Sequence, residues 1–171
     1  TSRLAVGTAD GELIVLKIGT MTEFSEQGER RKRPQIHAGP PIPVAKSPIV
    51  RLAYRSNDQG SLLALATKAG RLFLARIAPD DPGGADMVIT ELPQPPSAVT
   101  SLALDASHEH LFVGTADGHV VHVGLSEAQP PEVRGSYVVA APTTAVTMLG
   151  FLSGDRSLVV MAADGAVSTW G

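Results

Sequence analysis

Short apolar runs separated by tight polar turns recur along the chain, and they predict strands rather than helices. Four segments align without gaps: Leu4–Leu13, Leu63–Leu72, Leu111–Val120 and Leu158–Val167. Each consists of an apolar run, a turn that contains glycine, and a second apolar run. Three of the turns are Asp-Gly, a strong hairpin signal, because glycine adopts positive φ at little steric cost. The pattern therefore predicts four β-hairpins.

The spacing of these hairpins indicates the architecture. Their turn glycines are residues 11, 70, 118 and 165, so the intervals are 59, 48 and 47 residues. A second apolar block, at 49–54, 99–104 and 146–151, precedes three of the hairpins and predicts an inner strand for each. Periods of about 40–50 residues are typical of β-propellers, whose blades are four-stranded antiparallel sheets.

We therefore predict an all-β fold, a single β-propeller segment of four-stranded antiparallel blades that contains about three and a half blades. Outer strands are expected at 87–92 and 132–139, and in the first unit a longer hairpin turns near 25–28 and returns through 30–37. The total is fourteen strands, with no helix longer than a turn. The blades are a partial blade 1–47, a blade 48–96, a blade 97–142 and a partial blade 143–171.

The first unit lacks an inner strand and the last lacks an outer one. Unpaired strand edges favour association, so we expect the remaining blades of a longer parent chain, or self-association through the open blade edges. The faces expected to be exposed carry Leu4, Val6 and Leu13 at one end and Leu158, Val160 and Trp170 at the other.

Composition narrows the chemistry. Among 171 residues there is no cysteine, which excludes disulfides, thiolate metal sites and thiol catalysis. The net charge of −3 provides no general attraction to nucleic acid, so we expect no nucleic-acid partner. The longest apolar stretch, 137–152, is interrupted by Pro142 and is shorter than the roughly 20 residues that a membrane span needs.

Turn aspartates and a group of histidines are the candidate titratable residues. Asp10, Asp117 and Asp164 recur at one turn position, which favours a role in accepting backbone N–H bonds within each hairpin. A metal requires ligands that converge on one point. His119 and His122 are three residues apart on a strand, so their side chains face opposite sides of the sheet. Because such side chains do not converge on one point, we expect no metal, and we expect no cofactor either. The histidines considered are His108, His110, His119 and His122.

Hydroxyl groups and aromatic rings complete the candidate chemistry. A hydroxyl nucleophile needs an adjacent base to activate it. The inner strands carry no carboxylate or histidine near their hydroxyls, only Arg51, so we expect no enzyme activity. A propeller hydrolase is therefore a weak third hypothesis. The hydroxyl residues are Thr100, Ser101 and Thr147.

The aromatic residues could form a ligand cage, but their repeat positions favour core packing. They are Tyr54, Phe73, Phe112, Phe151 and Trp170.

One run of charge stands out as a possible interaction patch. It consists of Arg30, Arg31, Lys32 and Arg33, directly after Glu29. Such a run contacts acidic partners in some proteins. The alternative is a solvated hairpin edge whose charges discourage pairing with other strands.

The last unit resembles WD-repeat proteins. It reads Ala163-Asp-Gly-Ala-Val-Ser-Thr-Trp170, an Asp-Gly turn followed by a strand that ends in tryptophan. The other units place Leu16, Ala75 and Val123 at the tryptophan position, and none has the Gly-His dipeptide that opens such repeats. The resemblance implies a non-catalytic scaffold for protein–protein interaction.

A narrower resemblance concerns two segments, Leu149–Trp170 and Val6–Leu13, the second followed by the charged run Glu29–Arg33. Both look like parts of the soluble insertion of bacterial phosphate ABC transporter permeases. This resemblance implies a non-catalytic binding or regulatory domain that works with a membrane-embedded permease. It also implies a location at the bacterial inner membrane, on the extracytoplasmic side. We take this insertion as the leading hypothesis and the WD-repeat-like scaffold as the alternative.

Overall fold

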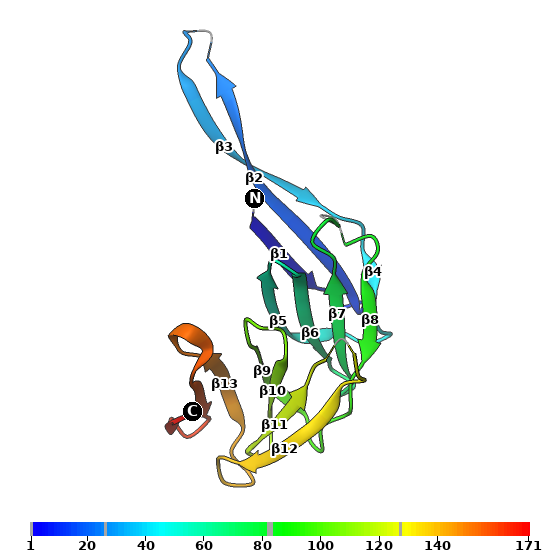
Figure 1. Ribbon diagram of the computed structural model, residues 1–171, viewed down its shortest axis with the longest axis vertical. Helices are drawn as coiled ribbons and strands as arrows, with labels where there is room; N and C mark the ends of the chain where they lie inside the picture. Colours follow the sequence, from blue (N-terminus) through cyan, green and yellow to red (C-terminus); the bar gives the residue numbers. More distant parts are fainter. Residues whose placement is uncertain (1, 26, 82–83, 127) are drawn as a thin grey trace.

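The computed structural model describes residues 2–25, 27–81, 84–126 and 128–171 (Figure 1). Within these residues, fifteen strands form four antiparallel sheets, and the single helical element is a three-residue 3₁₀ turn, Ser153–Asp155. This confirms the all-β fold built from propeller blades.

The four sheets follow one another along the chain. The first contains β1 (Ser2–Gly7), β2 (Glu12–Phe24), β3 (Arg30–Ala38) and β4 (Ile42–Pro43). The second contains β5 (Ile49–Asn57), β6 (Gly60–Thr67), β7 (Leu72–Ile77) and β8 (Val88–Glu91). The third contains β9 (Val99–Leu104), β10 (His110–Thr115), β11 (His119–Gly124) and β12 (Glu132–Val138). The fourth contains β13 (Val146–Phe151), β14 (Leu158–Ala162) and β15 (Val167–Trp170).

The strand positions agree with the sequence pattern except at one point. The inner strands β9 and β13 have the bounds that the repeats predict. The additional strand is β4, which raises the number from the expected fourteen to fifteen in the described residues. It pairs with Glu12 and Leu13 at the start of β2. Only two residues long, it has no apolar alternation that would have predicted it.

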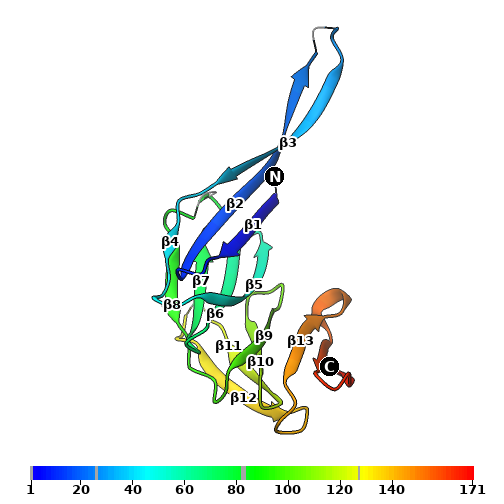
Figure 2. The same cartoon turned by 180° about the vertical axis from the view of Figure 1, so that it is seen from behind.

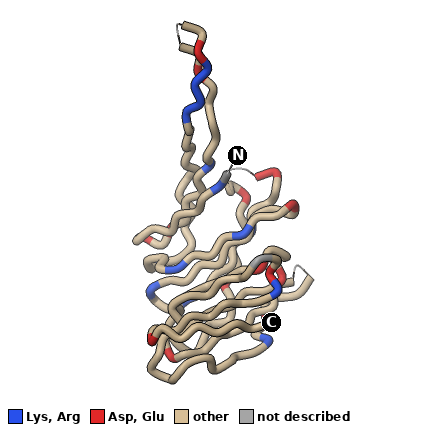
Figure 3. Tube along the Cα trace, turned by 90° about the vertical axis from the view of Figure 1, so that its left-hand side faces the viewer, with Lys and Arg blue, Asp and Glu red and all other residues tan. Residues whose placement is uncertain are grey.

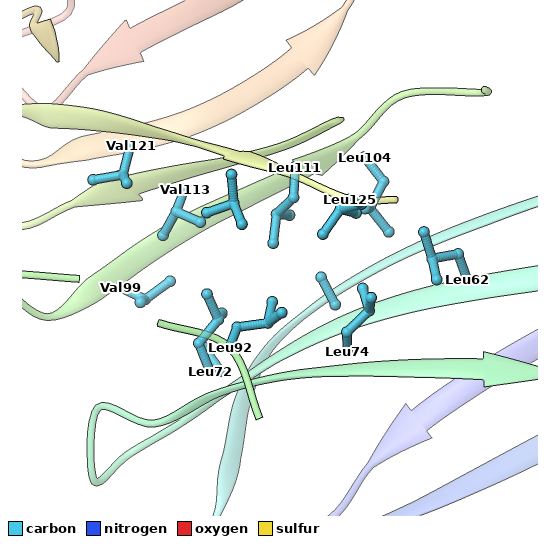
Figure 4. Close-up of a cluster of buried hydrophobic side chains, with 13 residues drawn as sticks. Leu62, Leu72, Leu74, Leu92, Val99, Leu104, Leu111, Val113, Val121 and Leu125 are labelled. Atoms are coloured by element: carbon cyan, nitrogen blue, oxygen red, sulfur yellow. The ribbon is translucent and has the colours of Figure 1, made fainter. Parts of the chain in front are cut away.

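Three apolar clusters lie between neighbouring sheets. The largest is formed by the second and third sheets and includes Leu62, Leu74, Leu111 and Val113 (Figure 4). Two further clusters join the first sheet to the second and the third to the fourth. An interior blade therefore buries both faces, which explains why β6 is buried at every position.

Hydrogen bonds at the inner strands connect the second sheet to the third. Arg51 Nε donates to the carbonyl of Thr100 at 2.7 Å, and Arg55 Nε donates to that of Leu104 at 3.0 Å. Asn57 Nδ2 extends the series with a bond of 3.1 Å to the carbonyl of Ala106, in the turn that follows β9. These bonds satisfy carbonyls on the free edge of β9, so Arg51 has a structural role.

The hairpin turns also connect neighbouring blades. The carbonyl of Gly118 accepts N–H bonds from Val139 and Ala140, in the segment that leads to the next blade. The φ of Gly118 is +80°, and a Cβ there would lie 2.7 Å from the carbonyl oxygen of Ala140. The turn therefore requires glycine both for its backbone conformation and for this close approach.

The exposure expected at the two ends is only partly correct. Leu4 and Val6 are 50% and 39% exposed, as expected. Leu13, in contrast, is fully buried, because it packs with the second sheet. Leu158 and Val160 are also buried, since the fourth sheet packs against the third.

Candidate functional sites

A hairpin projects from the first sheet away from the other sheets (Figures 1 and 2). It forms because β2 and β3 continue to pair as far as Phe24 opposite Arg30, whereas the pairing of β1 with β2 ends at Ile18. Beyond that point the two strands are a ribbon, and every residue of β3 is exposed.

One face of this ribbon carries ion pairs. Residues directly opposite each other lie on the same face, so Glu23 shares a face with Arg31. Arg33 Nε lies 3.2 Å from Glu23 Oε2, and Arg31 Nη2 lies 3.3 Å from Glu29 Oε2. Two of the four basic residues of the predicted patch, Arg31 and Arg33, therefore form exposed ion pairs within the hairpin.

The opposite face combines apolar side chains with the other two cations. Phe24 is 71% exposed and Ile36 is 63% exposed. Arg30 and Lys32 lie on the same face, and neither forms an ion pair within the described residues. Figure 3 shows the basic run along one strand of the hairpin. We call Phe24, Arg30, Lys32, Pro34 and Ile36 the apolar-basic face. The sequence pattern missed Phe24 and Ile36, although two-residue alternation from Arg30 leads to Ile36.

A second candidate site is a cavity of about 390 Å³ between the third and fourth sheets. Phe112 of β10 and Phe151 of β13 meet edge to face, with ring centroids 5.7 Å apart. Tyr137 of β12 and Trp170 of β15 form another pair, 6.1 Å between centroids and tilted by 50°. All four rings line the cavity, and each pair joins the two sheets.

Polar side chains line the same cavity. His110 Nδ1 and His122 Nε2 are 3.1 Å apart and share a hydrogen bond. Burial lowers the pKa of His122 below its usual value, and the neighbouring His110 and Arg134 lower it further against the opposing effect of Asp105. His122 is therefore neutral at neutral pH, stacked on the ring of Phe112 at 4.6 Å.

The aromatic residues have different environments. Phe73 is a core residue, 5% exposed, as predicted, and Tyr54 packs against the same cluster. Phe112 and Phe151 are partly buried against the third cluster. Trp170 is 43% exposed, which agrees with its predicted place on an exposed face and shows that core packing is wrong for it, because β15 is exposed along its length. Tyr137 belongs to the cavity without any sequence signal.

The histidines also have different partners. The structure brings His110 and His122 together across β10 and β11, a contact that the sequence did not predict. His119 Nδ1 lies 3.3 Å from Asp117 Oδ1 instead. Residues 2–25, 27–81, 84–126 and 128–171 contain no group of three or more His, Cys, Asp or Glu arranged to hold a metal.

The turn aspartates follow the prediction in part. Asp164 Oδ1 accepts the N–H of Ala166 at 2.9 Å, as predicted. Asp117 Oδ1 instead accepts the hydroxyl of Thr115 at 2.6 Å, and this bond lowers the pKa of Asp117. For Asp10 the described residues show no such bond.

The hydroxyls on the inner strands connect strands. Thr100 and Ser101 both donate to the carbonyl of Val146, at 2.6 and 3.0 Å, and thereby join the third sheet to the fourth. Thr147 donates to the carbonyl of Met161 at 3.1 Å. These contacts account for all three hydroxyls as structural groups.

Antiparallel sheets that follow one another along the chain and pack face to face are the blades of a β-propeller, and similar solved structures include a β-propeller domain. One is the β-propeller domain of Cps50 (Swd1) from Myceliophteria thermophila, with a TM-score of 0.62 and 19% identity; the match covers 98% of this chain and 47% of that one. Another is a chain of the Mitotic Checkpoint Complex, with a TM-score of 0.60, 15% identity, and coverage of 99% and 44%.

The present chain thus spans less than half the length of either neighbour, and identities this low show the fold alone. No protein-family model and no curated protein sequence matches the chain. Among the described residues, no helix has the length and apolar character to cross a membrane.

Proposed function

We propose that this chain is a non-catalytic β-propeller scaffold of the WD-repeat type that binds protein partners. Its likeness to WD40 propellers supports this function. The observation that carries the proposal is the projecting β2–β3 hairpin, with Phe24 and Ile36 largely exposed beside Arg30 and Lys32. Aromatic and arginine side chains are enriched at the centres of protein interfaces.

The chemistry of the apolar-basic face indicates what kind of partner fits. Arg30 and Lys32 have no carboxylate partner within the described hairpin, so an acidic surface would complement them. Burial of Phe24 and Ile36 would add about 25 cal/mol for each Å² of apolar area removed from water. The partner should therefore combine carboxylates with an apolar patch, and the predicted interaction patch becomes Arg30 and Lys32 rather than all four basic residues.

The hypothesis of a phosphate-permease insertion gains no support from the structural neighbours. A permease partner, an inner-membrane location and an extracytoplasmic side remain predictions of that resemblance alone. Apolar helical spans of about 20 residues on either side of this segment in its parent protein would favour that hypothesis. Further Asp-Gly blades that carry the Gly-His and Trp-Asp dipeptides would favour the scaffold.

Site-specific photo-crosslinking tests the scaffold function. A photoreactive phenylalanine replaces Phe24 in one sample and Met21 in the matched control, which lies on the same strand but on the opposite face. We expect a discrete protein to crosslink from position 24 and not from position 21. Once purified, that partner should bind the Phe24→Ser, Ile36→Ser double variant about tenfold more weakly, and Met21→Ser within about twofold of the unchanged chain. Equal binding to all three would refute the role of this face.

A further inference from the structure

The cavity between the third and fourth sheets is walled by aromatic rings from both sheets. Phe112 and Phe151 contact each other on one side of the cavity, where His122 covers one face of Phe112, and Tyr137 and Trp170 form a second pair. An aromatic ring presents a negative quadrupole on each face, so a cavity walled by several rings attracts cations. The volume of about 390 Å³ lies within the range of small-ligand pockets.

The charged side chains that line the cavity also favour a positively charged ligand. Asp105 Oδ1 accepts the backbone N–H of His110 at 2.8 Å, and Asp155 Oδ2 accepts that of Ala106 at 2.6 Å. Both carboxylates therefore accept hydrogen bonds from neutral N–H groups, and these bonds do not cancel the negative charge of either carboxylate. Arg156 is the only lysine or arginine among the described lining residues, and its side chain is exposed. The lining therefore carries two carboxylates against one cation.

We propose that this cavity binds a methylated ammonium group, such as the trimethylammonium head of a small molecule or of a methylated lysine. Methyl groups spread the charge and weaken hydration, so such a cation leaves water more easily than a primary ammonium and contacts ring faces on several sides. The site is separate from the hairpin, and it adds to the proposed scaffold function without depending on it.

Choline and its uncharged isostere 3,3-dimethylbutan-1-ol provide the matched test. The chain has a single tryptophan, so fluorescence excited at the indole reports on Trp170 in the cavity wall. We expect choline to produce a saturable change with a Kd on the order of 0.1–10 mM, as suits a ligand of so few atoms. The isostere should bind at least about tenfold more weakly, since it lacks the charge. Equal affinity for the two compounds, or no saturable change with choline up to about 100 mM, would overturn the proposal.

Substitutions locate the binding. Tyr137→Leu should weaken choline binding about tenfold, whereas Tyr137→Phe, which keeps the ring, should retain it. Val88→Ala, at a position 62% exposed in the second sheet and outside the cavity, serves as the control and should leave the choline affinity unchanged. Equal choline affinity in Tyr137→Leu and in the unchanged chain would overturn the assignment of the site.

The ¹H–¹⁵N spectrum of the unchanged chain provides an independent check. Choline should shift the signals of the single indole N–H and of the amides of Asp105 and Asp155. Shifts confined to other residues would refute the site.

A third probe distinguishes the two sources of the ammonium group. Acetyl-trimethyllysine amide carries the same head on a side chain that a protein could present. Binding at least as tight as that of choline would indicate a methylated protein segment as the ligand. Binding about tenfold weaker than that of choline would indicate a free small molecule. Because the hairpin does not contribute to the cavity, loss of choline binding would leave the crosslinking result at Phe24 unaffected.

Discussion

The second and fourth sheets contain the same hairpin motif but differ in burial. Every residue of β6 is buried, whereas every residue of β15 is exposed. The second sheet packs against the first on one face and against the third on the other. The fourth packs only against the third among the described residues. Apolar alternation therefore specifies a strand, while burial depends on having a neighbouring blade on each side.

The turns of the third and fourth blades show the same difference. Gly118 and Gly165 both have positive φ, +80° and +88°. A Cβ on Gly118 would meet the carbonyls of the segment that leads to the next blade, whereas a Cβ on Gly165 would have nothing within 4 Å. The same Asp-Gly pair thus forms a joint between blades in one sheet and a free turn in the other.

The largest effect should come from removing a core side chain of the second sheet. Leu65→Ala, at a fully buried position of β6, should lower the free energy of unfolding by about 2–5 kcal/mol. Val167→Ala, at a position 62% exposed in β15, should change it by no more than about 0.5 kcal/mol. Urea denaturation followed by circular dichroism measures both, and similar losses would show that the fourth sheet is buried in solution.

The turn glycines should differ by a smaller amount. Gly165→Ala should cost about 1–2 kcal/mol, because a Cβ is unfavourable at positive φ. Gly118→Ala should cost at least about 1 kcal/mol more, because its Cβ would also displace the segment at Ala140. Equilibrium unfolding of the two variants checks the order, and a larger cost at Gly165 would contradict the described joint.

The hydrogen bonds between inner strands should contribute less again. Arg55→Met keeps most of the side-chain volume but removes the donor to the carbonyl of Leu104, which should cost about 1–2 kcal/mol. Lys68→Met is the control, an exposed residue of the same blade, with an expected change within about 0.5 kcal/mol. Thermal unfolding at matched pH compares the two. A loss no greater than that of the control would mean that the Arg55 hydrogen bond adds no stability to the contact between the second and third sheets.

The smallest effect concerns pH. Burial lowers the pKa of His122, so the unfolded chain binds a proton more readily than the folded one. Stability is therefore present above the unfolded value of about 6.5 and is lost as pH falls through the folded pKa. The urea midpoint should be lower at pH 5.5 than at pH 7.5, and this difference should be larger in the unchanged chain than in His122→Gln. An equal pH dependence would exclude His122 as the cause.

Much of the strand framework was predictable because its signals are local. The Asp-Gly turns and the apolar runs around them specify hairpins through residues adjacent in sequence. Strand β4 carried no such signal, because its two residues pair only where the chain returns to β2. The burial of Leu13 and Leu158 was missed because it depends on the packing of whole sheets.

The candidate sites were harder to predict, because both depend on register and on contacts distant in sequence. The basic run was evident, and strand alternation alone divides it between two faces. Which face carries the ion pairs depends on the register that sets Glu23 opposite Arg31, and the sequence alone does not determine that register. The cavity brings together side chains from Asp105 to Trp170, on two separate sheets. No spacing rule links Tyr137 to Trp170, which belong to different repeats and meet only when the blades pack.

The length of the β2–β3 hairpin has a geometric consequence for assembly. Six residues of β2, from 19 to 24, extend beyond the last pair that β1 makes with it. At about 3.4 Å per residue, the tip stands roughly 20 Å from the body of the sheets. A partner held at the tip would leave the joint between the third and fourth sheets open to solvent. Because the hairpin and the third and fourth sheets lie at opposite ends of the molecule (Figure 1), a partner that contacts only the tip would not compete with a ligand in the proposed cavity.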